Sequence, residues 1–341
     1  EPPYATLDPL SRLLDEAGGL RAVVVGHGNV ALDCARVLAS PAAALRPTDA
    51  SRRLVEALEK LDATGATRRV DVVGRRGAAQ AAFTIKELRE LTTIDGARFV
   101  VAQSELEAGD TPKSVELCDT SRAHKRKRQL LDEWKGPVLT NPETTTNLVA
   151  MRFLLQPVEF KEDPARPGAL GSVVFERCTL DDATSRAVGT GDLVEFPANL
   201  ALTAVGYLAE PPHLTDERGS KQAMPHLTHA KGRLERGLYC AGWCKRGPSG
   251  IIGSNIADAR ETVSSMLEDF AASPPAAMSA GLSSSEGEDT AVSATTTWED
   301  WLALDAHERA LGDGVGAPRV KLDDVDEMLQ LLSEAAKGEK P

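Results

Sequence analysis

A run of three valines that leads directly into a glycine turn constrains this chain most. Residues 23–25 are β-branched and apolar, as in a buried strand, and Gly26 and Gly28 follow at once. Residues 30–38 then have helical spacing, so the sequence predicts a strand, a tight turn and a helix. This is the order of a dinucleotide-binding unit, with Ala31 in the place of the third glycine.

Each small residue of this unit has a separate physical task. Gly26 permits the turn, Gly28 lets backbone amides approach a diphosphate, and Ala31 allows the helix to pack closely on the strand. The free amides and the dipole at the helix N-terminus favour an anion. We therefore expect the phosphates of a dinucleotide here. The alternative is a strand–helix turn with a purely structural role.

A pair of arginines follows the second expected strand. Residues 70–73 are mostly valine and run into Gly74, Arg75, Arg76 and Gly77. In a dinucleotide-binding unit, the end of the second strand faces the adenosine ribose, where an acidic residue suits NAD and an arginine suits the 2′-phosphate of NADP. Guanidinium groups match phosphate oxygens in a bidentate way. The pair therefore favours NADP over NAD, the alternative being a solvated basic turn.

The next segments are expected to extend an α/β fold. Thr84 and Glu87 have the spacing of a capping box that opens a helix, and Glu87 can also lie close to the cofactor. A strand is expected near residues 99–103, and the polar residues 104–120 are expected to form a loop. Residues 151–159, 168–180 and 200–205 have the composition of further strands.

A basic run stands out because the chain as a whole is acidic. The 341 residues carry a net charge of −12, which argues against non-specific binding of nucleic acid. The run includes Arg126, Lys127 and Arg128. It predicts either an ordinary solvated helix face or a surface that docks an acidic partner. Nucleic acid is the weaker alternative, since Trp134 is the one aromatic residue near the run that could stack on bases.

A second glycine-rich turn lies at residues 237–253. A short apolar strand is followed by a loop that contains Gly242, Gly247 and Gly250, and a helix is expected from about residue 254. We interpret this turn as contacting a second cofactor. Cys240 and Cys244 lie within it, but their spacing is not that of a dithiol motif.

Composition limits the remaining possibilities. The five cysteines suggest no disulfide framework and fit a reducing compartment, and the six histidines have no metal-ligand spacing. No apolar run is long enough to span a bilayer. Residues 271–297 are rich in Ala, Ser, Pro, Gly and Thr and are expected to be a low-complexity insertion.

These motifs, in this order, resemble the mitochondrial-type NADPH:ferredoxin (adrenodoxin) reductases. The resemblance covers residues 20–335 apart from the insertion, and it also includes Asp300, Trp301, Pro318 and Arg319 near the C-terminus. It implies an α/β fold, with a Rossmann-like NADP-binding domain at residues 1–207 that starts with a short entry segment. Residues 208–341 would be the C-terminal part of a second, FAD-binding α/β domain.

The resemblance also implies roles for individual residues. Three groups of cofactor contacts are expected, at the diphosphate turn, at the 2′-phosphate and near the flavin. They are Gly26, His27, Gly28, Asn29 and Val30; Arg75, Arg76 and Glu87; and Trp243, Gly250, Ile251 and Ile252. The basic surface for the partner would be Arg126, Lys127 and Arg128. His27 stands where the family usually has Gln. No acid–base residue and no metal are expected.

The implied activity is that of a flavoprotein oxidoreductase. NADPH would reduce FAD, and electrons would pass to an acidic [2Fe–2S] ferredoxin, in the mitochondrial matrix and with at most peripheral association with a membrane. The family begins with a glycine-rich FAD segment that is not present ahead of residue 1 in this sequence. The alternative is therefore a truncated, catalytically silent fragment that binds NADP alone.

Overall fold

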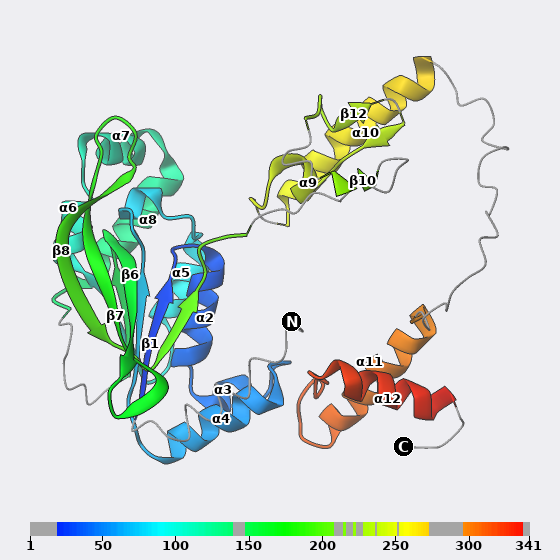
Figure 1. Ribbon diagram of the computed structural model, residues 1–341, viewed down its shortest axis with the longest axis horizontal. Coiled ribbons are helices and arrows are strands. Elements are labelled where there is room, and N and C mark those ends of the chain that lie inside the picture. The colour runs from blue at the N-terminus through cyan, green and yellow to red at the C-terminus, as the bar shows by residue number, and fades with distance from the viewer. Residues whose placement is uncertain are drawn as a thin grey trace. The chain divides into compact units, whose positions relative to one another are not determined.

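The computed structural model describes residues 19–138, 147–207, 214–215, 221–222, 228–235, 237–250, 252–272 and 296–336 (Figure 1). The chain forms two compact units, one of Glu1–Val205 with Thr295–Pro341 and the other of Gly206–Ala294. The entry segment lies outside the described residues, as does most of the expected low-complexity insertion.

A six-stranded parallel sheet forms the centre of the first unit. Its strand order is β4-β3-β5-β2-β1-β9, and each neighbouring pair is parallel. The strands are β1 Leu20–Val25, β2 Arg68–Val73, β3 Ala97–Ala102, β4 Lys135–Gly136, β5 Asn147–Arg152 and β9 Leu200–Thr203. Because β2 and β9 flank β1 on opposite sides, the chain leaves β1 at the point where the strand order reverses. In open α/β sheets, ligands bind at the carboxyl ends of strands at such a point.

Helices cover one face of this sheet. They are α2 Asn29–Ala39, α3 Ala42–Leu45, α4 Arg52–Ala63, α5 Ile85–Thr92, α6 Gln103–Ala108, α7 Pro112–Thr120 and α8 Arg122–Glu133, with a 3-10 turn at Ala78–Gln80. Alternate residues of β1, such as Ala22 and Val24, share a core with Leu32 of α2 and Leu88 of α5. The side chains of successive strand residues point to opposite faces, so Val23 and Val25 remain for the other side.

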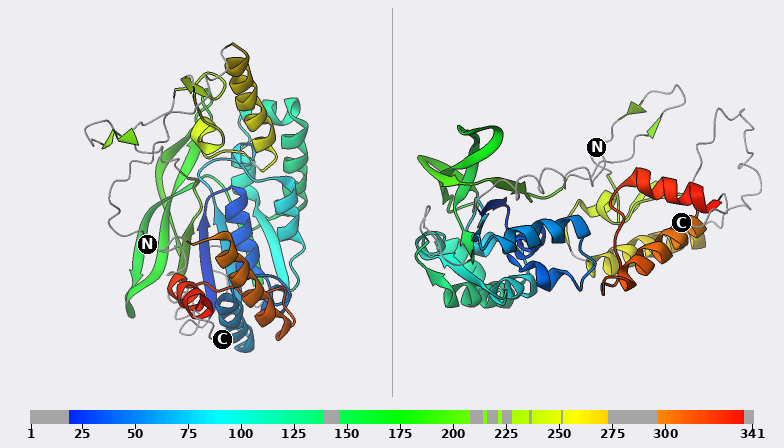
Figure 2. Two further views of the ribbon diagram at one scale, coloured as in Figure 1. Left: turned by 90° about the vertical axis from the view of Figure 1, so that its right-hand side faces the viewer. Right: turned by 90° about the horizontal axis from the view of Figure 1, so that it is seen from below.

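An antiparallel sheet of three long strands covers that other side (Figure 2). It consists of β6 Leu155–Asp163, β7 Arg166–Leu180 and β8 Ala187–Pro197. Phe175 and Phe196 from this sheet pack with Val23, Val25 and Val73 in a second core. The parallel sheet is therefore buried on both faces, which agrees with its nearly continuous apolar strands.

Two predicted segments of the first unit are wrong in detail. Residues 104–120 are largely helical, in α6 and α7, where a loop was expected. The helix α7 begins at a Thr111 N-cap followed by Pro112, a start signal that does not depend on apolar spacing. The segment of residues 151–159, expected to be one strand, belongs to two strands. The extended conformation is interrupted at Phe153 and Leu154, where the chain passes from one sheet to the other.

The C-terminal helices α11 Trp298–Asp313 and α12 Val325–Ala336 belong to the first unit. The side chain of Asp323, just before α12, accepts a hydrogen bond from Ser51 Oγ at 2.8 Å and pairs with Arg53 at 3.2 Å. The chain passes from the first unit to the second between Val205 and Gly206, and residues 296–336 pack with the first unit, while the expected division into domains at residues 1–207 and 208–341 stays a prediction. Contacts between segments so far apart in the sequence are not visible in local patterns.

The second unit is small in its described part. It contains the strands β10 Leu214–Thr215, β11 Lys221–Gln222, β12 Arg233–Glu235 and β13 Leu238–Tyr239, and the helices α9 Trp243–Arg246 and α10 Ser254–Ala272. Asp269 of α10 accepts hydrogen bonds from Arg233 at 2.7 Å and from the hydroxyl of Tyr239 at 2.6 Å, which fixes the β12–β13 hairpin on the helix. Within the described residues of both units, no helix is long and apolar enough to cross a membrane.

Candidate dinucleotide-binding site

The register of two parallel strands brings the glycine turn and the arginine loop together. Val25 of β1 lies opposite Val73 of β2, so the residues that leave these strands are neighbours. The amide of Gly26 donates to the carbonyl of Val73 at 2.8 Å. A methyl group at Gly74 would lie 2.4 Å from the imidazole Nδ1 of His27, so the two loops are packed directly against each other.

The two glycines of the turn meet different constraints. Gly26 has φ +137°, and a methyl group there would lie 2.2 Å from the carbonyl oxygen of Ala204, just after β9. Gly28 has a φ of −99°, and a methyl group there would have no atom within 4 Å. Gly26 is therefore required by the fold. The space over Gly28 is open, as a ligand that approaches the backbone needs.

The N-terminus of α2 faces this open space without a side-chain cap. Gly28 is the N-cap residue, and it contributes no capping hydrogen bond. Asn29 is turned to another helix, since its Oδ1 accepts the amide of Thr84 at 2.8 Å. Val30 is 48% exposed. The uncapped amides at this end of the helix and its dipole favour a diphosphate.

Arg75 and Arg76 are both exposed beside this turn. Neither guanidinium group forms a hydrogen bond or a salt bridge with another described residue. A guanidinium in this state is available to a phosphate, whereas one held by a carboxylate would first have to exchange partners. The residues present therefore fit a dinucleotide with a 2′-phosphate.

His27 forms the wall between the two loops. Its ring lies edge-on to Phe153, with 4.7 Å between centroids, and its Nε2 lies 3.3 Å from the carbonyl of Val72. Burial lowers the pKa of His27 to about 4, and the positive charges of Lys127 and Arg76 act in the same direction. The imidazole is therefore neutral near pH 7 and donates its Nε2 hydrogen to Val72.

The expected capping box at the start of α5 is not formed. Thr84 is the N-cap residue, but its hydroxyl makes no capping hydrogen bond. The hydroxyl oxygen of Thr84 and the Oε2 of Glu87 are both buried with no hydrogen-bond partner in the described structure. Buried polar atoms are normally satisfied, so these two mark a place where a ligand can supply the partner.

The basic run lies on α8, and its members differ in exposure. Arg126 is exposed, whereas Lys127 is buried and donates to the carbonyl of Ala81, with its ammonium 5.1 Å from the ring of Phe83. Arg128 is paired with Asp110 and Asp132. α8 thus turns Lys127 away from solvent and toward residues 81–83, and the amides of residues 82 and 83 donate to the carbonyl of His27 in the glycine turn.

The second glycine loop is fixed to α10 by a buried lysine. Lys245 Nζ lies 2.7 Å from Glu261 and 3.2 Å from Asp258, and Asp258 also accepts the amide of Gly242. Although burial lowers the pKa of Lys245, its hydrogen bonds to Glu261 and Asp258 hold the pKa above the ordinary value. His229 supports the same loop through a hydrogen bond from its Nε2 to the carbonyl of Lys245 at 2.8 Å, since its Nδ1 accepts the amide of Gly232.

This loop presents an aromatic and a glycine-rich surface. Trp243 is 48% exposed and lies 5.5 Å from Tyr207, with the rings tilted by 31°. Gly250 has φ +93°, and a methyl group there would lie 2.7 Å from the Oγ of Ser254. Ile252 is almost fully exposed, and Ile251 lies outside the described residues. The described residues fit close approach of a flat ring system to this loop.

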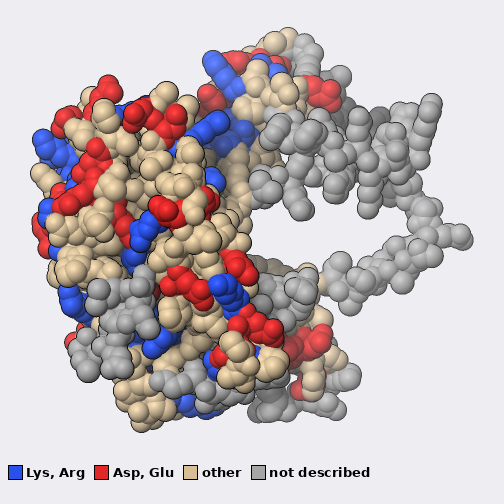
Figure 3. Space-filling model, turned by 60° about the vertical axis from the view of Figure 1, so that its left-hand side comes forward, with Lys and Arg blue, Asp and Glu red and all other residues tan. Residues whose placement is uncertain are grey.

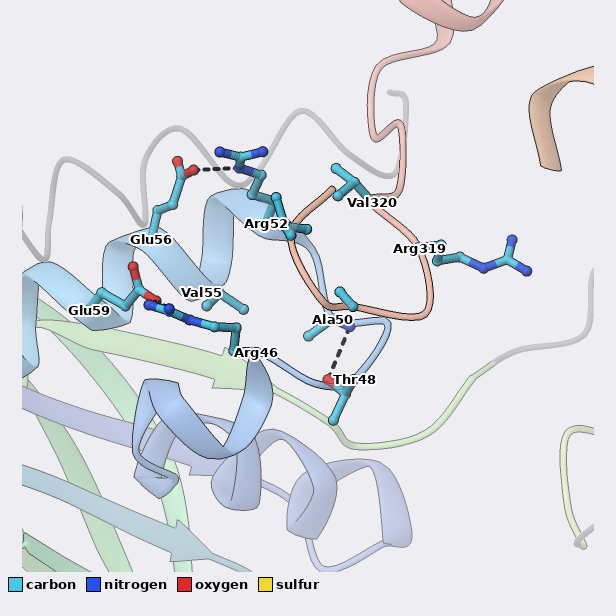
Figure 4. Close-up of a pocket in the computed structure, with 11 residues that line it drawn as sticks. Arg46, Thr48, Ala50, Arg52, Val55, Glu56, Glu59, Arg319 and Val320 are labelled. Carbon is cyan, nitrogen blue, oxygen red and sulfur yellow. Dashed lines mark hydrogen bonds and ion pairs between the residues drawn. The ribbon is translucent and has the colours of Figure 1, made fainter. Parts of the chain in front are cut away.

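A separate pocket of about 250 Å³ lies between α4 and the loop at residues 315–320 (Figure 4). Ala50, Val55 and Val320 give it an apolar wall. Its charged rim is already paired, since Arg46 binds Glu59 and Arg52 binds Glu56. None of the expected cofactor residues lines this pocket.

Comparisons with known proteins agree with the geometry. The chain is 35% identical to human mitochondrial NADPH:adrenodoxin oxidoreductase, over 91% of this chain and 63% of that protein. It is 33% identical to the Arabidopsis thaliana protein of the same name, over 96% of this chain and 68% of that protein. The structure of FprA from Mycobacterium tuberculosis in complex with NADPH matches with a TM-score of 0.72 and 31% identity, over 96% of this chain and 70% of that one. No family model matches.

The chain belongs to the family of NADPH:adrenodoxin and NADPH:ferredoxin reductases. The resemblance inferred from the motifs is therefore confirmed, and so is the predicted α/β fold class. The chain spans about 63% of the length of the human relative.

The sequence analysis did not predict one buried ion pair of this chain. Arg152, at the end of β5, and Glu105, in α6, form a buried ion pair behind the arginine loop. Glu105 lies in a segment expected to be a loop, and Arg152 lies in an apolar run. A charged residue inside an otherwise apolar strand was the one signal that could have indicated a buried partner.

Proposed function

We propose that this chain binds NADPH at the glycine turn between β1 and α2 and takes part in electron transfer from NADPH through FAD to a [2Fe–2S] ferredoxin. The observation that carries the proposal is the position of Arg75 and Arg76 beside Gly28, at the uncapped end of α2. A 2′-phosphate at the arginines and a diphosphate at the helix would be held by two adjacent parts of one surface.

In this proposal the residues of the turn bind and orient the dinucleotide. The amides at the start of α2 donate to the diphosphate, and Arg75 and Arg76 hold the 2′-phosphate as charge-assisted hydrogen-bond donors. Thr84 and Glu87 each offer a buried polar atom without a partner, which a hydroxyl or amide of the ligand would satisfy. Neutral His27 keeps its hydrogen bond to Val72 and adds no charge.

The loop at residues 242–252 is proposed to contact FAD. Trp243 would pack against a flat ring, and Gly250 and Ile252 would lie near the cofactor. Ile251 is proposed with them from its position in the sequence alone. FAD, when bound, accepts two electrons as a hydride equivalent and releases them one at a time.

The proposed partner is an acidic [2Fe–2S] ferredoxin. The names of the relatives include adrenodoxin and ferredoxin. Arg126 offers a free positive charge on α8, whereas Lys127 holds the fold and Arg128 is already paired. Figure 3 shows acidic and basic side chains interspersed over the face in view.

A mitochondrial location with at most peripheral membrane contact is proposed from the relatives. The human and Arabidopsis thaliana proteins are named as mitochondrial, and similar relatives are bacterial. Nucleic acid is not proposed as a partner, because the chain carries a net charge of −12. The second candidate function is binding of NADP(H) without electron transfer, for which the uncapped N-terminus of α2 and the exposed pair Arg75 and Arg76 would suffice.

Three measurements test the proposal. The visible absorption spectrum of the purified chain reports bound flavin, and NADPH-driven reduction of a [2Fe–2S] ferredoxin reports electron transfer. The double variant Arg75→Ala/Arg76→Ala should weaken NADPH binding by at least about tenfold and leave NADH binding nearly unchanged. Equal losses for both dinucleotides would contradict the assignment, and NADPH binding without flavin or ferredoxin reduction would favour the second candidate.

A further inference from the structure

Four charged side chains lie inside the first unit, behind the arginine loop. Arg69 and Asp71 are in β2, Arg152 is at the end of β5, and Glu105 is in α6; all four are buried. Arg152 is 3% exposed and donates to Glu105 from Nε at 3.0 Å and from Nη2 at 2.5 Å. Its Nη1 lies 3.6 Å from Asp71, which is itself bound by Arg69 at 2.6 Å.

Burying such a cluster of charges in a core costs desolvation free energy. Removing charges from water costs several kcal/mol for each ion, and well-packed apolar residues often serve stability equally well. The four side chains are buried, and the guanidinium of Arg152 lies over the ring of Phe196, 4.4 Å from its centroid. We therefore expect the cluster to act on a ligand through the backbone and not by direct contact.

Glu105 holds more than the side chain of Arg152. Its Oε2 also accepts the backbone amide of Phe153 at 2.9 Å. One carboxylate therefore fixes a side chain and the next peptide group, at the point where the chain leaves the parallel sheet for β6. Phe153 is fully buried, and its ring packs on His27 at 4.7 Å.

The segment that Glu105 fixes in turn holds the arginine loop. The carbonyl of Arg152 accepts the amide of Gly74 at 3.1 Å, and the carbonyl of Gly74 accepts the amide of Leu155 at 3.2 Å. The carbonyl of Arg76 accepts the amide of Leu154 at 3.4 Å. Three backbone hydrogen bonds thus join residues 74–76 to residues 152–155.

The same segment contains a strained residue. Leu154 has φ +55°, in the left-handed region that residues other than glycine rarely adopt, and it is buried. A conformation of this kind persists only where the surrounding contacts hold it, and it is common near functional sites. The contacts that hold it here are the bond to Arg76, the bond from Cys178 to its carbonyl at 2.8 Å, and the anchoring of the preceding residues by Glu105.

We propose that Glu105 is a positioning residue for recognition of the 2′-phosphate. By fixing Arg152 and the amide of Phe153, it holds the backbone of residues 74–76 in the conformation that presents Arg75 and Arg76. This inference rests on the proposed function of NADPH binding. Bidentate contacts between guanidinium and phosphate depend on geometry, and a displacement of about 1 Å can cost about 100-fold in an oriented site.

The test compares the affinities of the whole 341-residue chain for NADPH and NADH, measured by titration of their fluorescence. Glu105→Gln keeps the shape of the side chain and removes its charge. The affinity for NADPH should fall by about tenfold and that for NADH by less than about twofold, so that the ratio of the two dissociation constants moves toward one. Glu105→Asp keeps the charge on a shorter side chain and should shift the ratio of the dissociation constants in the same direction, but by less. If Glu105→Gln does not fold, the ratio measured for Glu105→Asp tests the inference in its place.

Asp62→Asn is the matched control. Asp62 pairs with Arg68, which is 1% exposed and lies at the opposite end of β2 from the arginine loop. This variant should lower stability and leave the ratio unchanged. If the control shifts the ratio as much as Glu105→Gln, or if Glu105→Gln lowers both affinities equally, the inference is overturned. A wild-type chain without preference for NADPH overturns the proposed function as well, whereas a preference that Glu105→Gln retains overturns this inference alone.

Discussion

The side chain of Asn29 joins the first turns of two helices that are 55 residues apart in the sequence. Its Oδ1 accepts the backbone amide of Thr84 at 2.8 Å, so the start of α5 is tied to the start of α2. Both helix N-termini therefore keep one geometry around the candidate phosphate site. Two substitutions of Asn29 separate its structural effect from its electrostatic effect.

Asn29→Ala removes the acceptor and should lower the free energy of unfolding by about 1 kcal/mol, measured by urea denaturation. Asn29→Asp keeps an acceptor for Thr84 and places a negative charge at the helix N-terminus, which favours the helix. This second variant should keep the stability but bind NADPH several-fold more weakly, because its carboxylate repels the diphosphate. Tight binding of NADPH by Asn29→Asp would show that the phosphates lie elsewhere.

Gly26 and Gly28 should respond in opposite ways to the same added methyl group. Gly26→Ala forces a contact of 2.2 Å with Ala204 at a φ of +137° and should destabilise the chain by more than about 3 kcal/mol, which thermal unfolding would show. Gly28→Ala meets no atom within 4 Å and should unfold at nearly the wild-type temperature. It should nevertheless weaken NADPH binding, since the methyl group occupies the open space over the helix. Unchanged affinity in a folded Gly28→Ala variant would argue against that space being the ligand site.

His27 should make stability depend on pH in a defined window. Its pKa is lowered by burial to about 4 in the folded chain, against 6.5 for an ordinary histidine. Between these values the unfolded chain binds a proton that the folded chain does not, so the free energy of unfolding decreases as the pH falls from about 6.5 to about 4. The contribution is fully present above pH 6.5 and amounts to at most about 3 kcal/mol.

The variant His27→Gln tests this assignment, because its side chain does not titrate. Urea denaturation at a series of pH values should give a flatter profile for the variant between pH 4 and 6.5. Parallel profiles for the variant and the wild type would assign the pH dependence to other groups.

Substitutions of an exposed and of a buried residue in the basic run on α8 should have separate effects, the first on ferredoxin docking and the second on stability. Arg126→Glu should leave stability within about 0.5 kcal/mol of the wild type, but raise the KM for ferredoxin, most strongly at low ionic strength. Lys127→Ala removes a buried side chain that donates to Ala81, and it should lower stability by about 2 kcal/mol. A KM for Arg126→Glu that does not depend on salt would remove α8 from the proposed docking surface.

The local features of the candidate phosphate site could be predicted from the sequence. The strand of residues 20–25, the turn at Gly26 and the helix that follows are set by neighbours in the chain, namely β-branched residues, glycine and helical spacing. The place of Arg75 and Arg76 followed as well, because consecutive parallel strands of such a unit usually lie side by side. The same local reasoning predicted the capping box at Thr84 and Glu87, which is not formed, because the amide of Thr84 binds Asn29 of another helix.

Long-range packing determined the rest. Whether Lys127 reaches solvent depends on how α8 is rotated against the segment that contains Ala81, and the buried pair of Glu105 and Arg152 joins residues 47 positions apart. The grouping of α11 and α12 with the first unit likewise depends on Asp323 meeting Ser51. A residue type and its sequence neighbours determine which local backbone conformation has the lowest free energy. Burial and pairing between distant segments depend on the packing of the whole chain, and no local pattern contains that information.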